Sequence, residues 1–157
     1  MKNNDEVIDL LNDLICINND RIEGYEKASE ELKPKKDADS FMLLDRAQES
    51  RVFRNELIPA VVRLGGKPAE NSTAAGKLYR TWMDLKTTFS GGSAKSVFEL
   101  CEQGEDAALK AYDAALQEDV IFPDEIQETL SRQKQIIKEA HDKIRSKRDA
   151  LKKEVTH

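Results

Sequence analysis

Two glycine-containing breaks interrupt an otherwise helix-forming sequence, and they limit most strongly how the chain can fold. Gly65-Gly66, followed by Pro68, is typical of the end of a helix, and Ser90-Gly91-Gly92-Ser93 is a second break. Elsewhere strong helix formers dominate, with only seven Gly and four Pro in 157 residues. The chain therefore divides into two helical parts separated by a long connector.

Apolar residues recur at spacings of three and four in both helical parts, as they do on one face of a helix. This pattern predicts four long helices and a short one, at about Asp5–Leu32, Ala38–Leu64, Ala74–Thr88, Ala94–Gln117 and Pro123–Leu151. The short helix carries the only tryptophan, Trp82. A small-ligand pocket beneath this helix, lined by Trp82 and Phe89, is one functional alternative, and plain packing of the helix onto the others is favoured over it.

The lengths of the connections predict how the long helices are arranged. Short linkers join the first helix to the second and the third to the fourth, so each of these pairs should be antiparallel. The connector from Gly65 to Ser93 can return along a helix of roughly 35–40 Å, at about 1.5 Å per residue. We therefore expect one all-α domain over residues 1–157, a ferritin-like four-helix bundle with a long crossover that carries the short helix. A plain up-and-down bundle with a decorated loop is the alternative.

Charge and composition exclude several classes of partner. The net charge is −5, with 25 basic and 30 acidic residues mixed along the chain, so we expect no nucleic-acid partner. No apolar run approaches the ~20 residues that cross a bilayer, and residues 1–6 do not resemble a signal peptide. Of the two cysteines, Cys16 should point outward and Cys101 into the core. The sequence predicts a cytoplasmic protein without membrane partners, and it leaves a homodimer open.

Seven short stretches, in order along nearly the whole chain, resemble an uncharacterised bacterial family of ferritin-like four-helix-bundle proteins. They are Leu11-Asn12-Asp13-Leu14-Ile15, Glu23-Gly24-Tyr25, Glu56-Leu57, Leu64-Gly65-Gly66-Lys67-Pro68, Trp82-Met83-Asp84-Leu85-Lys86, Gly104-Glu105-Asp106 with Tyr112, and His141-Asp142. The resemblance implies a ferritin-like fold. It implies little about activity, because a fold does not determine a function.

Four ionisable side chains are candidate metal ligands because they fall near the apolar faces of their helices. Glu105 and His141 lie near the core lines of the third and fourth long helices, and Glu49 and Glu56 share one stripe of the second. Asn18 lies at a similar height on the first helix. Carboxylates and imidazoles are suitable ligands for iron or manganese. The sequence therefore allows a mid-bundle site formed by Glu49 or Glu56 with Glu105 and His141.

A complete di-iron centre is not expected. Ferritin-like di-iron proteins supply a Glu from each of two helices and a Glu-x-x-His motif from each of two others. Both histidine motifs are missing, because Lys138 stands three residues before His141 and Val52 stands three residues after Glu49. Phosphate-loop and nucleophile-elbow signatures are missing as well, so the sequence does not favour an enzyme and leaves the question open.

Two interpretations of the polar residues remain. The favoured one is a buried network in which Glu105 pairs with His141, Arg51 or Arg54 and fixes the helix register. The protein is then a structural or interaction protein. The alternative is an iron- or manganese-binding ferritin-like protein that acts in storage, sensing or oxidative-stress defence.

Overall fold

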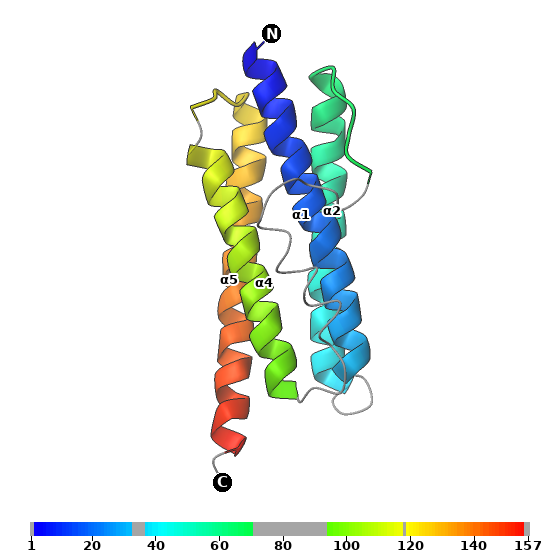
Figure 1. Ribbon diagram of the computed structural model, residues 1–157, viewed down its shortest axis with the longest axis vertical. Coiled ribbons are helices and arrows are strands. Elements are labelled where there is room, and N and C mark those ends of the chain that lie inside the picture. Colours follow the sequence, from blue (N-terminus) through cyan, green and yellow to red (C-terminus); the bar gives the residue numbers. More distant parts are fainter. Residues whose placement is uncertain (1, 33–36, 71–93, 118, 156–157) are drawn as a thin grey trace.

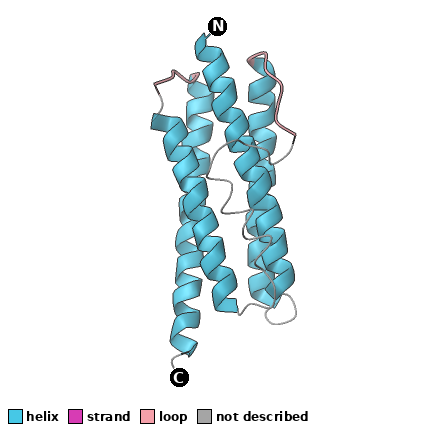
Figure 2. Cartoon of the chain, in the orientation of Figure 1, coloured by secondary structure: helices cyan, strands magenta, loops and turns pink. Residues whose placement is uncertain are grey.

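Four long helices make up most of the described chain. The computed structural model describes residues 2–32, 37–70, 94–117 and 119–155, and within them it contains helices and no strand (Figure 2). The helices are α1 (Lys2–Leu32), α2 (Asp37–Arg63), α4 (Ala94–Gln117) and α5 (Asp124–Val155). None of these four is long and apolar enough to cross a lipid bilayer. The all-α prediction is confirmed, while the short helix predicted at 74–88, with Trp82 and its pocket, lies outside the described residues.

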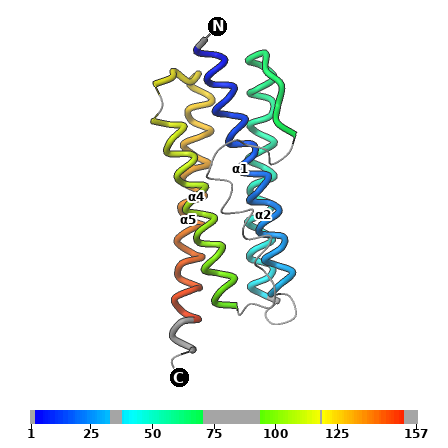
Figure 3. The backbone as a smooth tube through the Cα atoms, in the orientation of Figure 1, coloured from blue at the N-terminus to red at the C-terminus, as the bar shows by residue number. Residues whose placement is uncertain are grey.

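The helices pack side by side in a bundle in which α2 and α4 run in the same direction (Figures 1 and 3). In Figure 1, α1 descends from the N-terminus, α2 and α4 both ascend, and α5 descends to the C-terminus. Helix α1 contacts α2 and α4, and α5 contacts α4 and α2, so α2 and α4 are diagonal neighbours. The chain between Arg63 and Ala94 therefore joins opposite ends of the bundle, as the long connector predicts.

Helix α2 ends in a glycine motif that turns the chain back toward α1. Gly65 has a positive φ of 89°, and the backbone N–H groups of Gly65 and Gly66 donate to the carbonyls of Val62 and Val61, both at 3.0 Å. These two bonds form a Schellman motif, which satisfies carbonyls at the end of a helix. The chain then lies along α1, where Asn12 accepts from the backbone N–H of Ala69 at 2.8 Å.

A polar layer divides the apolar core into two clusters. The cluster nearer the N-terminus of α1 includes Leu11, Leu57 and Tyr112, and the cluster toward the other end includes Leu43 and Phe98. The layer between them consists of buried polar side chains, each 0% exposed: Asn18, Arg21, Ser50, Glu105 and Gln133. The predicted apolar faces of α4 and α5 are therefore buried together with the polar residues that interrupt them.

The prediction that Cys16 points outward is wrong, because its side chain is buried. Ile15, Cys16, Ile17 and Asn18 are all buried, although four consecutive residues point in very different directions around a helix. The middle of α1 is therefore covered on more than the face that its apolar periodicity marks. Cys101 is buried as predicted, and burial, followed by the negative charge of Glu105, raises the pKa of its thiol well above the ordinary value.

Substitution of Gly65 should test the end of α2. A Cβ at this position meets no atom within 4 Å, so the effect of Gly65→Ala comes from the left-handed backbone alone. We expect this variant to lower the free energy of unfolding by about 1–2 kcal/mol in urea denaturation. Gly65→Asn should lose less, because asparagine adopts this conformation more readily. Equal stability of the alanine variant and the unchanged chain would contradict the motif.

Candidate functional site

A buried arginine lies at the centre of the polar layer. Arg21, on α1, is 0% exposed, and its guanidinium donates to Glu105 of α4 through Nε at 2.7 Å and through Nη2 at 2.8 Å. Glu105 is also 0% exposed. Two parallel N–H···O bonds between a planar guanidinium and a carboxylate are the strongest form of this ion pair. The pair therefore links α1 to α4 in the middle of the bundle.

The same guanidinium also contacts α2. Arg21 Nη1 donates to the hydroxyl of Ser50 at 2.9 Å, and Nη2 donates to Glu49 at 3.1 Å. The second oxygen of Glu49 lies 3.0 Å from Arg46, near the solvent. Burial raises the pKa of Glu49, and the charges of Arg21 and Arg46 partly offset this effect. One side chain of α1 thus holds carboxylates from two other helices.

Electrostatics keep Arg21 charged despite its burial. Removal from water favours the neutral guanidinium, but the adjacent charge of Glu105, the hydrogen bond to it and the charge of Glu49 outweigh this, and the pKa of Arg21 is raised. Tyr25 lies beneath the cation, with its ring centre 5.3 Å from the guanidinium carbon. Burial, and then the charge of Glu105, raise the pKa of the Tyr25 phenol well above its ordinary value. The centre is a charged guanidinium paired with two carboxylates.

Hydrogen bonds extend this centre to α5. Asn18 accepts from the Ser50 hydroxyl at 2.9 Å and donates to the Tyr112 oxygen at 2.9 Å. Tyr112 in turn donates to Gln133 of α5 at 2.6 Å. Gln133 then donates to Glu56 at 3.1 Å. Side chains from all four helices therefore join one continuous network, which we call the Arg21 network.

The four candidate metal ligands have three different environments. Glu49 and Glu105 both bind Arg21, while Glu56 contacts Gln133 and Arg132 at the far end of the network. His141 lies at the α4–α5 edge, where its Nε2 is 2.7 Å from Asp106. Glu105 was the predicted partner of His141, but in the structure His141 contacts the next residue, Asp106. One residue turns a helix by about 100°, so Glu105 faces the core and Asp106 faces the edge.

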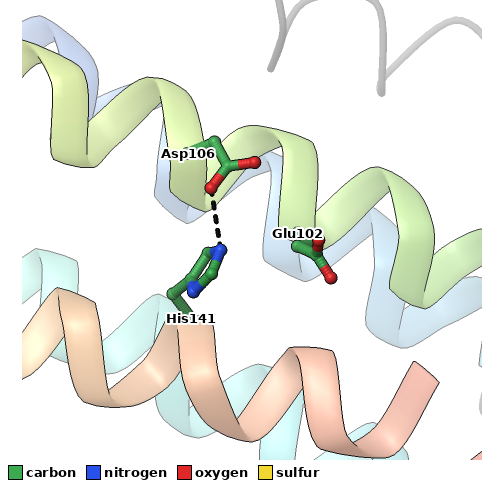
Figure 4. Close-up of side chains that lie close together, drawn as sticks. All are labelled: Glu102, Asp106 and His141. Atoms are coloured by element: carbon green, nitrogen blue, oxygen red, sulfur yellow. Dashed lines mark ion pairs between the residues drawn. The ribbon is translucent and has the colours of Figure 1, made fainter. Parts of the chain in front are cut away.

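A second cluster surrounds His141, and we call it the rim cluster. Figure 4 shows Glu102 and Asp106 on α4 at the side that faces α5, with Asp106 paired with His141 of α5. One potential ligand atom of each lies within 4.8 Å of the other two. The His141 side chain is 7% exposed and the Asp106 side chain is 50% exposed, so the cluster is open on one side. On the other side of the ring, Nδ1 lies 3.2 Å from Asp142.

Sequence reasoning missed Arg21, although a signal for it was present. Asn18, Arg21 and Tyr25 are spaced by three and four and continue the apolar face of α1. An arginine on such a face needs a buried anion, and Glu105 was already placed there. Glu102 and Asp106 were missed for a different reason, because they lie beside the apolar face of α4 rather than on it.

A family model matches residues 6–118 of the chain, with the description "Domain of unknown function (DUF2383)". The chain belongs to the DUF2383 family. The match covers most of α1 and all of α2 and α4, and therefore Arg21, Glu49, Ser50 and Glu105, while α5 lies beyond it. No curated protein matches the sequence.

Removal of the central charge should be far more costly than removal of a surface charge. Arg21→Met leaves Glu105 buried without a cation, and we expect a loss of about 3–5 kcal/mol in urea denaturation. Glu105→Gln retains a hydrogen-bonding group and should cost less. The double variant Arg21→Met/Glu105→Leu should recover much of the stability, because replacement of a buried ion pair by apolar residues is often neutral.

Arg51→Met is the matched control. Arg51 pairs with Glu26 and also links α1 to α2, but the two side chains are 34% and 43% exposed. Exposed pairs of this kind contribute about 0–1 kcal/mol. If Arg21→Met and Arg51→Met had the same free energy of unfolding, the Arg21 network would not stabilise the bundle more than an exposed ion pair does.

Proposed function

We propose that the protein is a ferritin-like bundle with a structural or interaction role, and that Arg21 takes the interior position at which related bundles hold metal. The observation that carries this proposal is the contact of one buried guanidinium with both Glu49 and Glu105. The parallel direction of α2 and α4 supports the ferritin-like topology (Figure 1). The interior carboxylates are then already neutralised, and a metal ion would have to displace a buried cation to reach them.

Metal analysis with a Glu105 variant tests this proposal. The unchanged chain and Glu105→Gln, both without an affinity tag, are incubated with Fe²⁺ in the absence of oxygen, desalted and assayed for iron. We expect the same iron content in both proteins, since Glu105 serves Arg21. If the unchanged chain bound two iron ions and Glu105→Gln bound none, the proposal would be contradicted. This result would favour the alternative, an iron- or manganese-binding protein that acts in storage, sensing or oxidative-stress defence.

An apolar stripe on the outer face of α2 supports the interaction role. Its members lie along about 30 Å of one helix, and their exposed fractions are 39–65%. They are Phe41, Leu44, Val52 and Val62. They lie on one side of the helix, as the apolar contacts of an interaction surface would.

A second copy of the chain is the partner that fits this stripe. If two copies of α2 pair antiparallel about a two-fold axis near Val52, Leu44 of one copy meets Val62 of the other. The same axis brings the exposed Asp45 of one copy near the exposed Arg63 of the other. Leu44 is thus matched with Val62 and Asp45 with Arg63, as a two-fold interface requires of the positions that meet in it. We propose a homodimer formed through α2.

Sedimentation velocity tests the dimer. The unchanged chain should sediment as a dimer, and Val52→Asp should shift it to a monomer, because the axis places this residue close to its own copy. Gln135→Asp adds the same charge at an exposed position of α5 and should remain dimeric. A monomeric unchanged chain, or a Val52→Asp variant that stays dimeric, would exclude this interface.

A further inference from the structure

The rim cluster combines three side chains whose spacing suits a metal ion. Glu102 and Asp106 are four residues apart on α4 and therefore lie on the same face of that helix. His141 approaches them from α5, with Nε2 directed at Asp106 (Figure 4). All three positions lie on long helices, which hold their backbones in place. One nitrogen and two carboxylate oxygens thus lie within 4.8 Å of one another.

We propose that Glu102, Asp106 and His141 bind a divalent first-row transition-metal ion, with water at the remaining coordination positions. A mixed imidazole and carboxylate ligand set suits ions of the Zn²⁺, Fe²⁺ and Mn²⁺ group. The site is separate from the Arg21 network and does not depend on the function proposed above. It differs from the interior ligand set suggested by the sequence, with which it shares only His141.

The orientation of the histidine ring is an independent observation in favour of a metal. Asp142 lies 3.2 Å from Nδ1, on the side of the ring opposite to Asp106. A histidine that ligates a metal commonly donates its second N–H to a carboxylate, which fixes the tautomer and the direction of the ring. Asp142 is placed to accept this bond when Nε2 binds an ion instead of sharing a proton with Asp106.

Small side-chain movements would bring the ligand atoms to binding distance. Metal–nitrogen and metal–oxygen bonds of about 2.0–2.2 Å require the ligand atoms to lie within about 4.4 Å of one another. The separations in the structure are up to 4.8 Å. Asp106 is half exposed, so its carboxylate can rotate without disturbing the core. Glu102 is 14% exposed and His141 is 7% exposed, and these two provide the more rigid part of the site.

Arg148 is the competitor of the metal ion. Its Nη1 lies 2.7 Å from one oxygen of Glu102, and its Nη2 lies 2.9 Å from Asp149. Because Arg148 is 26% exposed, it can leave Glu102 and retain Asp149. Lys138 is a second nearby cation, 3.5 Å from Asp142. A metal ion therefore has to displace the solvent-accessible guanidinium of Arg148 from Glu102.

The experiment is titration of the full chain, without an affinity tag, with Zn²⁺ by isothermal calorimetry. We expect one Zn²⁺ per chain, and His141→Gln and Asp106→Asn should abolish the binding. Asp142→Asn should weaken it by about 10–100-fold, the usual effect of losing a carboxylate behind a ligating histidine. Arg148→Met should strengthen it, because the competing cation is removed.

Two control variants separate this site from nonspecific binding. Asp113 also lies on α4 and pairs with a cation of α5, Lys134, but no histidine is near it in the described contacts. Asp113→Asn should therefore bind Zn²⁺ as the unchanged chain does. His157→Gln removes the only other histidine and should have no effect.

The visible spectrum of the Co²⁺ protein supplies a second measurement. The unchanged chain should show ligand-field bands, and these should be absent in His141→Gln while its cooperative unfolding remains. If Zn²⁺ did not bind, or if binding survived in His141→Gln, the proposal would be overturned. It would also fail if Arg148→Met bound more weakly than the unchanged chain, since Arg148 would then assist the ion rather than compete with it.

Discussion

The buried ion pair of Arg21 and Glu105 is the interaction on which the rest of the bundle depends. Removal of a guanidinium and a carboxylate from water costs several kcal/mol for each ion, and only close, well-directed partners offset this cost. Here the partners come from α1, α2 and α4, with both members 0% exposed. A shift of one helix by a single turn, about 5.4 Å, would leave both charges buried and unpaired. The pair therefore selects one relative height for three helices, which apolar packing alone would specify less strictly.

The geometry of arginine explains why this residue suits the position. Its guanidinium carries five donors in a fixed plane, so it can bind Glu105 through two nitrogens and still reach Ser50 and Glu49. A lysine would offer a single point of charge and could not bridge the same set. Within the Arg21 network, the fourth helix is joined through the Tyr112 hydroxyl and Gln133, which are neutral groups. Charge thus links α1, α2 and α4 in the interior, while α5 is reached there by hydrogen bonds and carries its ion pairs nearer the surface.

Most of the fold could be predicted from the sequence, and much less of the candidate site could. Helix bounds and the parallel direction of α2 and α4 follow from periodicity, from Gly65-Gly66 and from connector length, which are local properties. The burial of Glu105 also followed from its helical phase. The residue that pairs with Glu105 could not be predicted from this phase, because side-chain contacts depend on how two helices are rotated about their axes. An error of one residue in this rotation places Glu105, in place of Asp106, beside His141. The prediction for Cys16 was wrong for a related reason, since apolar periodicity marks the most apolar face of a helix and not every face that is buried.

The two charged clusters differ in whether their cation can exchange with solvent. In the Arg21 network the cation is fully buried, so an incoming ion would have to force a guanidinium into an apolar core or into water through packed side chains. In the rim cluster the competing cation is Arg148, which stays in contact with water and has Asp149 as a second partner. Coulombic attraction between the carboxylates and a divalent ion acts at both places, but only at the rim can the displaced charge be rehydrated. Glu105 and Asp106 are adjacent in sequence, but the rotation of about 100° between them directs Glu105 into the buried interior and Asp106 to an edge where ions can exchange.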